Sequence, residues 1–425
     1  MLLERDQSSK EMVIEIKVIS METIKPSSPT PKSLAKYHLS FLDKLAPPIF
    51  PQLVYFYSSN PKIPNSLKSN HLKKSLSETL STFYPLAGRL VGNSHVNCND
   101  AGVPFAEAEA NCNLSQIVTD PDPKNTSKFA IPQKALGLCL AVQVTYFRCG
   151  GTAVGIMFLH KIGDALSLLM FANAWSAATR GGGVPPPVFD AASYFPPRDI
   201  PGYNPTSGIL KEEIEARIFR FPASKIAALR ERYTAACGGH RPSRVEALSA
   251  FIWTQFISAT GMKPDPNKIY AVLQTVNLRT RADPPLSEHH FGNIYGLSTA
   301  RPEAGDGGVE LLRKMREAVE AVDSGYVARL KDGEKHLEFM SKMLVQDTKG
   351  ELVSFNFTSL CRLPLYEADF GWGKPVWVGF SGFPFKNLVT FVDTKSEGGI
   401  EALVNLKKRD MEKFQACLEN LQSKL

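Results

Sequence analysis

The sequence lacks the cysteine spacings that build disulfide scaffolds or zinc sites. Its seven cysteines are odd in number and widely scattered, and no two of them form a C-x-x-C pair. This usage excludes a disulfide framework and a zinc ribbon, and it is typical of reduced thiols in a cytosol. We therefore expect a cytoplasmic protein that binds no metal.

Long hydrophobic runs and blocks of one charge are also missing. No stretch reaches about 18 uninterrupted apolar residues, the length expected of a membrane span. Glu4, Arg5 and Asp6 stand where a signal peptide would need an apolar core. The 49 Lys and Arg exceed the 42 Asp and Glu by a net charge of +7, which is spread along the chain. That excess suits an anionic small ligand better than nucleic acid, so we expect neither a membrane nor a nucleic-acid partner.

What is present is the composition of a globular protein, with 43% hydrophobic and 21% charged residues. At 425 residues the chain is long enough for two or three domains. In the first half, apolar residues alternate as in strands or recur every three to four positions as in helices. The expected strands are 13–18, 138–146 and 152–159, with 55–57 in a strand core, and the expected helices are 69–83 and 166–179.

A segment rich in Gly and Pro, residues 181–210, separates this half from a second one. Beyond it the expected strands are 218–221, 269–277 and 380–392, and the expected helices are 224–236, 243–258, 309–322 and 411–425. Strands and helices alternate on both sides of this linker, which predicts an α/β protein. We expect an N-terminal domain of residues 1–180, a crossover linker of 181–210 and a C-terminal domain of 211–425.

His160 is the first candidate for chemistry. It follows the apolar run 152–159, and Asp164 comes four residues later across a turn that contains Gly163. This places an imidazole at the end of a strand. An ordinary histidine has a pKa near about 6.5, so it is mostly neutral at neutral pH and can accept a proton. The alternative is a surface histidine with Asp164 capping the next helix, and the pattern alone leaves both open.

The second candidate is the segment Asp369-Phe-Gly-Trp-Gly373. Two glycines around a tryptophan indicate a tight loop, and a purely structural turn fits equally well. The first three letters occur in protein kinases, but the other kinase motifs are missing, so that class is excluded. No nucleophile elbow, P-loop or metal-ligand spacing is found elsewhere.

Taken together, the two motifs resemble the plant BAHD acyltransferases. The resemblance extends over nearly the whole chain through Tyr84-Pro-Leu-Ala-Gly-Arg89, Asn97-Cys-Asn-Asp100 and Asn277-Leu-Arg279. The leader from Ile24 to Pro31 and the stretch Cys149-Gly-Gly-Thr152 are most similar to the alkaloid and terpenoid acetyltransferases of that family. Each motif is moderately specific, and their order and spacing make the set strong.

The resemblance implies two chloramphenicol-acetyltransferase-like domains joined by a long crossover, with the active site in a channel at their interface. It implies direct transfer of an acyl group, here expected to be acetyl, from acetyl-CoA to a hydroxyl of an alkaloid or terpenoid. Acetyl-CoA is then a co-substrate, no cofactor stays bound, and the enzyme is expected to be a monomer. His160 would be the general base. A larger acyl donor, an amine acceptor, or an inactive relative that only binds remain as alternatives.

The same resemblance assigns roles to other residues. Asp164 would pair with Arg279 and shape the active-site turn without relaying a proton. Asp369, Gly371, Trp372 and Gly373 would be structural, and so would Asn293 in Phe291-Gly-Asn293. Ser243 and Arg244 would contact the CoA phosphate, and Ser243 also begins a capping box with Glu246, which is compatible because a helix N-terminus attracts phosphate.

One position departs from the pattern. Many relatives carry a tryptophan where this chain has Leu360, and in some of them its indole N–H helps to hold the oxyanion. Leucine has no donor, so Thr358, a backbone N–H or a water would have to replace it. Loss of one such donor costs on the order of 3 kcal/mol of barrier. Either the donor differs here or the channel is reshaped for a bulkier acceptor.

Overall fold

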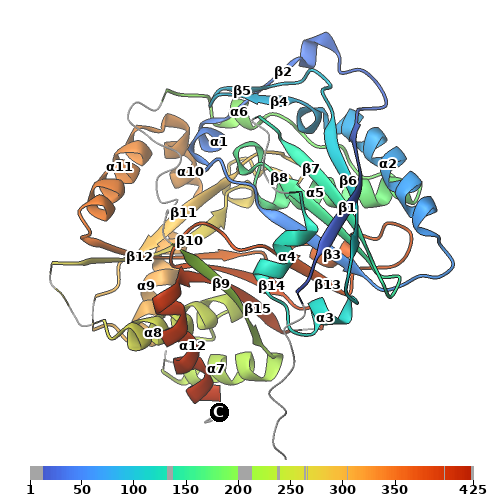
Figure 1. Ribbon diagram of the computed structural model, residues 1–425. Helices are drawn as coiled ribbons and strands as arrows, with labels where there is room; N and C mark the ends of the chain where they lie inside the picture. The colour runs from blue at the N-terminus through green and yellow to red at the C-terminus, as the bar shows by residue number, and fades with distance from the viewer. Residues whose placement is uncertain are drawn as a thin grey trace, which may run out of the picture.

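The structure is a computed structural model that describes residues 13–131, 137–199, 213–236, 240–262, 265, 267–303, 305–396 and 398–422. Within these residues, two six-stranded mixed sheets lie side by side and helices cover them (Figure 1). The expected α/β class with two sheet domains is confirmed. No helix in the described part of the chain is both long and apolar enough to cross a membrane.

The first sheet carries the order β1-β6-β7-β8-β3-β13. Its strands are β1 (Ile16–Ile24), β3 (Gln52–Tyr57), β6 (Val103–Ala110), β7 (Leu140–Phe147), β8 (Thr152–Phe158) and β13 (Trp377–Phe380). Its helices are α1 (Phe41–Leu45), α2 (Asn65–Thr82), α3 (Ser115–Val118), α4 (Pro123–Thr126) and α5 (Ala165–Thr179). A small sheet of β2 (Lys36–His38), β5 (His95–Asn97) and β4 (Arg89–Val91) lies beside them.

Helices α2 and α5 pack together against the first sheet. The predicted stripe of Leu72, Leu76 and Leu80 is fully buried, and α2 begins four residues before the expected start at residue 69. The strands β7 and β8 are buried along their whole length, which explains why their sequences are nearly continuous apolar runs. A buried strand leading into a helix therefore carries His160 to the edge of this sheet.

The second sheet has the order β11-β10-β12-β14-β15-β9. Its strands are β9 (Ile214–Phe221), β10 (Ile269–Asn277), β11 (Tyr295–Ala300), β12 (Leu352–Ser359), β14 (Leu388–Asp393) and β15 (Ile400–Lys407). The helices of this half are α7 (Ala223–Ala236), α8 (Arg244–Thr260), α9 (Gly308–Glu320), α10 (Ser324–Asp332), α11 (Glu334–Thr348) and α12 (Lys408–Gln422). A second core joins α8, α9 and α12 to one face of this sheet.

Strand β13 departs from the sequential division into two domains. It comes from the C-terminal half, yet it pairs antiparallel with β3 at the edge of the first sheet, with Trp377 opposite Phe56. The two rings stack with centroids 5.1 Å apart. The expectation that everything after residue 211 belongs to the second domain is therefore wrong for this strand, because its pairing partner lies in the other half.

The predicted strand 380–392 is also wrong as a single element. The chain leaves β13 at Phe380 and enters β14 at Leu388. Pro384 between them cannot donate a ladder hydrogen bond, and Gly382 lies where an added Cβ would be 2.6 Å from the Cβ of Ala216. These residues form the turn that takes the chain from the first sheet to the second.

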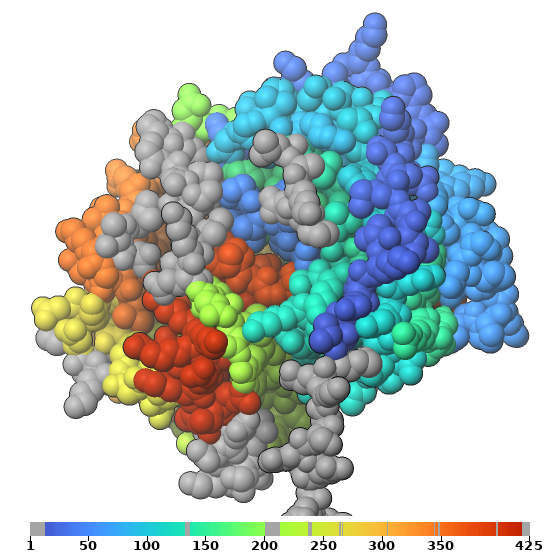
Figure 2. All heavy atoms as spheres, viewed as in Figure 1, coloured from blue at the N-terminus to red at the C-terminus, as the bar shows by residue number. Residues whose placement is uncertain are grey.

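The crossover contains one short helix, α6 (Ala191–Tyr194), and is otherwise irregular over residues 181–199. Its expected remainder, residues 200–210, lies outside the described residues. In the space-filling view, the surface is hollowed between the blue-to-cyan N-terminal half and the red C-terminal segments (Figure 2).

Candidate active site

His160 begins a single turn of 3-10 helix directly after β8. Its backbone N–H donates to the carbonyl of Ile49 at 3.0 Å, which fixes the turn, and its imidazole is half-buried. Burial lowers the pKa of His160, while the nearby Asp164 charge and the Asn293 side chain oppose that shift. The imidazole is therefore neutral at neutral pH. This is the state that a general base needs.

Asp164 is the N-cap of α5, and its carboxylate accepts from the Ser167 backbone N–H at 3.0 Å. Gly163 makes this turn possible, because a Cβ there would lie 2.8 Å from the Cβ of Ser167 and 3.1 Å from the ring of Phe158. Asp164 thus caps the following helix, as one of the two sequence interpretations predicts. This capping leaves room for a second contact on the same carboxylate.

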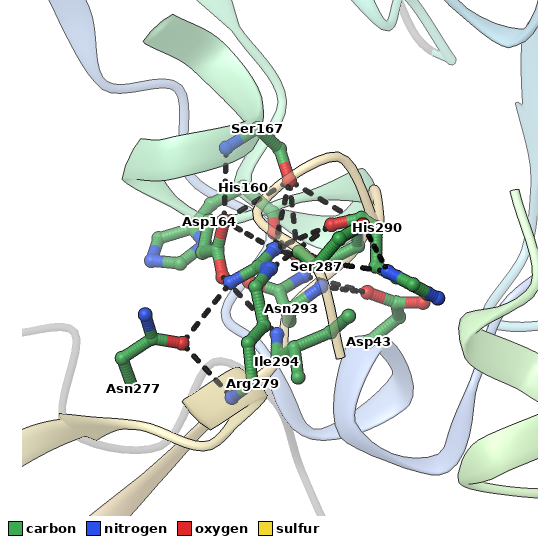
Figure 3. Close-up of polar contacts among 11 residues, drawn as sticks. Asp43, His160, Asp164, Ser167, Asn277, Arg279, Ser287, His290, Asn293 and Ile294 are labelled. Carbon is green, nitrogen blue, oxygen red and sulfur yellow. Dashed lines mark hydrogen bonds and ion pairs between the residues drawn. The ribbon is translucent and has the colours of Figure 1, made fainter. Parts of the chain in front are cut away.

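That second contact is the expected ion pair with Arg279. The Nη1 of Arg279 lies 2.7 Å from one carboxylate oxygen of Asp164, and its Nη2 lies 3.2 Å from the other (Figure 3). Burial would raise the pKa of Asp164, but the Arg279 charge and the hydrogen bonds outweigh it and hold this pKa below the ordinary value. Both oxygens are engaged, so Asp164 is held as an ion that faces Arg279.

Arg279 follows β10, and its guanidinium is 2% exposed. Its Nε and Nη2 also donate to the carbonyl of His290 at 3.0 and 2.8 Å, and Nη2 donates to the carbonyl of Gly292 at 3.3 Å. A planar guanidinium supplies several donors in fixed directions, and here they tie α5 to the loop before β11. The ion pair therefore joins the two halves of the chain beside His160.

The family resemblance predicts a structural role for Asn293, and the sequence assigns no role to Asp43. Asp43 lies in α1, and its buried carboxylate accepts from both the backbone N–H and the side-chain amide of Asn293, at 2.7 and 2.8 Å. The same amide donates to the backbone carbonyl of His160 at 2.8 Å. The signal available in the sequence was Ser40-Phe-Leu-Asp43, a capping-box pattern. The structure has that box at the start of α1.

Lys161 follows the histidine but points away from it. Its side chain is buried, and Nζ donates to the backbone carbonyls of Asp43 at 3.3 Å and Lys44 at 2.8 Å. Burial lowers the pKa of Lys161 to about 8. This cation therefore does not face the imidazole.

The Asp369 segment closes on itself. One oxygen of Asp369 accepts from the backbone N–H groups of Gly371 at 2.8 Å and Gly373 at 3.0 Å, and both glycines have positive φ near 100°. Phe370 is buried with its ring centroid 4.8 Å from that of Trp175, and its ring stacks on Trp372. The side-chain Nη1 of Arg180, at the end of α5, donates a hydrogen bond to the backbone carbonyl of Asp369. These contacts anchor a loop of the C-terminal half to the first core.

Ser243 and Arg244 stand at the N-terminus of α8. The Ser243 hydroxyl accepts from the Glu246 N–H at 3.1 Å and the Glu246 carboxylate accepts from the Ser243 N–H at 2.7 Å, so the expected capping box is confirmed. Arg244 forms an ion pair with Asp393 at 2.9 Å. The positive charge of Arg244 is thus already paired with a carboxylate.

Thr358 lies near the end of β12, pointing to the face opposite Phe355 and Phe357, which enter the second core. Among the described residues its hydroxyl has no hydrogen-bond partner. Leu360 is buried, and its own backbone N–H donates to the carbonyl of Phe391 at 2.8 Å. That N–H is therefore not available as a substitute donor.

The structure thus brings His160, Asp164 and Arg279 together (Figure 3). Within the described ranges, no hydrogen bond or ion pair joins Thr358, the pair Ser243 and Arg244, or the loop 369–373 to these three.

A cavity of about 290 Å³ lies along the edge strand β11. Its walls include Leu297, Thr299, Tyr326, His336 and Phe339 from β11, α10 and α11. On the same face of β11, two residues before Leu297, Tyr295 lies with its ring centroid 6.1 Å from that of His160. The strand face that contacts the imidazole therefore continues into this cavity.

Residues 14–421 match the model described as the Transferase family. Limonoid 21-O-acetyltransferase of Melia azedarach is 38% identical over 417 residues, covering 95% of this chain and 96% of the relative. Stemmadenine O-acetyltransferase of Catharanthus roseus is 35% identical over 417 residues, covering 94% and 96%. An N-malonyltransferase of Strychnos nux-vomica, acting on 17,18-epoxy-17-hydroxycur-19-ene, is 34% identical over 415 residues, covering 94% and 89%.

The crystal structure of vinorine synthase superposes with a TM-score of 0.82 at 35% identity, covering 94% of this chain and 96% of that one. Fold, site and sequence agree on the class, and the protein is a transferase that moves acyl groups. More narrowly, the chain belongs to the Transferase family in its plant branch, the BAHD acyltransferases.

Proposed function

We propose that the protein transfers an acetyl group from acetyl-CoA to a hydroxyl of an apolar alkaloid or terpenoid, with His160 as general base. The observation that carries this proposal is the neutral, half-buried imidazole at the junction of the two halves, beside the Asp164–Arg279 pair. The names of the limonoid and stemmadenine acetyltransferases support the acetyl donor and the acceptor class.

The proposed reaction needs no covalent enzyme intermediate. Nε2 of His160, which has no hydrogen-bond partner among the described residues, takes the proton of the acceptor hydroxyl. The hydroxyl oxygen forms a bond to the thioester carbonyl carbon, and the carbonyl becomes a tetrahedral oxyanion. When the C–S bond breaks, CoA leaves as a thiolate and the imidazolium returns the proton to it. General-base help of this kind contributes about 10²- to 10⁴-fold.

Asp164 does not take part in this proton path. Its two carboxylate oxygens are occupied by Arg279, by Ser167 and by the backbone. Its role in the proposal is to hold the turn that carries His160. Thr358 is proposed as the oxyanion donor, because its hydroxyl is unpaired while the backbone N–H of Leu360 is used in the sheet.

The CoA phosphate is proposed to contact Ser243 and Arg244. The first backbone N–H groups of α8 favour an anion there. The Asp393 partner of Arg244 reduces the net positive charge, so phosphate binding would need Arg244 to share its guanidinium between Asp393 and the ligand. This predicts a contact that depends more on hydrogen bonding than on charge.

The acceptor is proposed to extend its apolar body into the cavity along β11. That cavity, at about 290 Å³, is close to the lower end of small-molecule pockets and has largely apolar and aromatic walls. Replacing Phe339 by Ala should raise the KM for a bulky acceptor and leave the KM for acetyl-CoA unchanged. The matched control is Val345→Ala, on the same helix but exposed to solvent.

A second candidate is malonyl transfer to an amine, which the Strychnos relative favours by its name. A malonyl donor brings a carboxylate whose burial without a cation would cost several kcal/mol. Lys161, the cation next to the base in sequence, is occupied by the carbonyls of Asp43 and Lys44. This observation favours the acetyl donor.

We further propose that the enzyme works as a monomer in the cytoplasm. One chain supplies both sides of the site, with His160 from the first half and Arg279 from the second. The cysteines within the described residues are all free thiols, which suits a reducing compartment. Light scattering of the purified enzyme tests the first part, and imaging of a tagged chain in plant cells tests the second.

The deciding experiment measures CoA thiol release from acetyl-, malonyl- and coumaroyl-CoA with hydroxylated alkaloid and limonoid acceptors. We expect acetyl-CoA to have the highest kcat/KM, and His160→Ala to lower it by about 10²-fold or more. His71→Ala, at an exposed position on α2, is the matched histidine control and should change nothing. Near wild-type turnover by His160→Ala would remove the histidine from the mechanism.

A further inference from the structure

Asp43 is a buried carboxylate with an unusual set of donors. Oδ2 accepts from the backbone N–H and hydroxyl of Ser40 at 2.9 and 2.7 Å. Oδ1 accepts from the backbone N–H and the side-chain amide of Asn293 at 2.7 and 2.8 Å. Capping of the five-residue helix α1 accounts for the first oxygen only. The second oxygen holds a residue 250 positions away.

The orientation of the Asn293 side-chain amide is fixed by its hydrogen bonds. Its Nδ2 donates one proton to Asp43 and the other to the backbone carbonyl of His160. Exchange of the amide nitrogen and oxygen would place Oδ1 against the Asp43 carboxylate, where it would be repelled. The direction of Oδ1 is therefore set by Asp43.

Two buried atoms lie in this cluster without a hydrogen bond. They are Oδ1 of Asn293 and Nδ1 of His160, and neither has a partner in the described part of the chain. Buried polar atoms are nearly always paired, so an unpaired acceptor and an unpaired ring nitrogen in one cluster require an explanation. The two atoms do not meet hydrogen-bond geometry, but the Asn293 amide is a neighbour of the histidine, because its Nδ2 lies 2.8 Å from the backbone carbonyl of His160. The backbone of His160, the Asn293 side chain and the backbone of Gly163 all raise the pKa of His160 against the effect of burial.

We propose that Asp43 is a positioning residue for His160, acting through Asn293, whose Oδ1 it aims at the Nδ1–H of the imidazole. This inference rests on the proposed function of His160 as general base. A hydrogen bond from Nδ1–H to Oδ1 selects the tautomer in which Nε2 carries a free lone pair. The same bond stabilises the imidazolium that forms when the acceptor hydroxyl gives up its proton.

Among the described residues, the other side chains around the histidine do not supply this bond. Asp164 faces Arg279 and Ser167, and Lys161 donates to backbone carbonyls of α1. The Tyr295 ring contacts the imidazole from β11. Asn293 is thus the side chain that joins His160 to the buried carboxyl group of Asp43, whose pKa is raised by burial against the opposing effect of its hydrogen bonds from Asn293 and Ser40.

The first test compares Asp43→Ala with Ser40→Ala. Both changes weaken the cap of α1, but only the first removes the oxygen that holds Asn293. We expect Asp43→Ala to lower kcat on the order of 10-fold to 10²-fold, the scale of a misplaced catalytic group, with little change in the KM for acetyl-CoA. Ser40→Ala should keep its kcat within about threefold of the wild type. Equal losses in kcat would show that Asp43 only caps the helix.

The second test uses Asn293→Ala, which leaves the helix cap intact. Because Asp43 acts through Asn293, the double variant should be no slower than the slower single variant. Additive losses would overturn the proposal. Removing Oδ1 should also lower the pKa of His160 further, since burial is then less opposed, so the acidic limb of kcat/KM against pH should move to lower pH. A limb that stays in place while the rate falls would indicate a structural role alone.

These outcomes separate the inference from the proposed function. If His160→Ala keeps its activity, the general-base proposal fails and no positioning role remains. If His160→Ala is inactive while Asp43→Ala and Ser40→Ala behave alike, only the inference about Asp43 is overturned. Thermal unfolding of each variant identifies a loss of activity that comes from a loss of fold.

Discussion

Asp164 and Arg279 hold each other through two parallel contacts of 2.7 and 3.2 Å, and this pair lies across the junction between the two halves of the chain. The guanidinium is 2% exposed and the carboxylate 11% exposed. Removing one partner leaves the other as a buried charge, which costs about 3–5 kcal/mol. The pair therefore fixes both the turn that carries His160 and the way in which the halves meet.

We predict that Asp164→Ala and Arg279→Ala are strongly non-additive in the free energy of unfolding. Residues of one buried ion pair show couplings of about 0.5–3 kcal/mol. The matched control is the exposed pair Glu367–Lys374, in which both side chains are more than half exposed. Its double-mutant cycle should give less than about 1 kcal/mol. A coupling for Asp164 and Arg279 no larger than this control would contradict the prediction.

This ion pair also shows what the sequence could and could not predict. Local periodicity located α2, α5, β8 and β10 within a few residues, because each is a long buried element with one clear pattern. The pairing of Asp164 with Arg279 came from the family resemblance. Nothing in the spacing of 115 residues predicts it.

Pairings over long distances in sequence account for most of what was missed. The four-residue strand β13 pairs with β3 from the other half, and no local pattern marks so short a strand as belonging to the first sheet. Strand β1 was expected at 13–18 but runs from Ile16 to Ile24, because its register is set by pairing with β6. The second role of Asp43 could not be predicted for the same reason, because it depends on hydrogen bonds from Asn293, which lies 250 positions away in the sequence.

The activity should depend on pH in a way set by His160. Its pKa is lowered by burial, so the imidazole stays neutral to a lower pH than an ordinary histidine. The neutral form is the active base. We therefore expect kcat/KM to rise with pH through an acidic limb below about 6.5 and to be constant above it. An apparent pKa above that value in kcat/KM would contradict the environment that the fold gives to this residue.

Stability should depend on pH through His336. Burial among Phe41 and Phe339 lowers the pKa of His336 to about 4. Because the folded state takes up this proton less readily than the unfolded state, the contribution is fully present above about 6.5 and is lost as the pH falls toward about 4. The loss is at most about 3 kcal/mol.

The measurement is Tm against pH for the wild type and His336→Phe, which fills the same space with a ring that does not titrate. We expect the variant to lose less stability than the wild type between pH values of about 6.5 and 4. The control is His71→Phe, because His71 is exposed on α2. Parallel Tm curves for the wild type and His336→Phe would mean that His336 is as free to protonate as in the unfolded chain.

The replacement of the missing indole donor is tested at Thr358. Its hydroxyl points away from the second core and has no partner among the described residues, whereas the backbone N–H of Leu360 is bonded to Phe391. If this hydroxyl donates to the oxyanion, Thr358→Val should lower kcat by about 10²- to 10³-fold, because that donor acts in the transition state. The KM for acetyl-CoA should change little, since the ground-state carbonyl gains less from the bond. Thr358→Ser keeps the hydroxyl and should recover most of the rate. A Val variant as active as the Ser variant would assign the oxyanion to a water or to another backbone N–H, and Thr358 would then only line the channel.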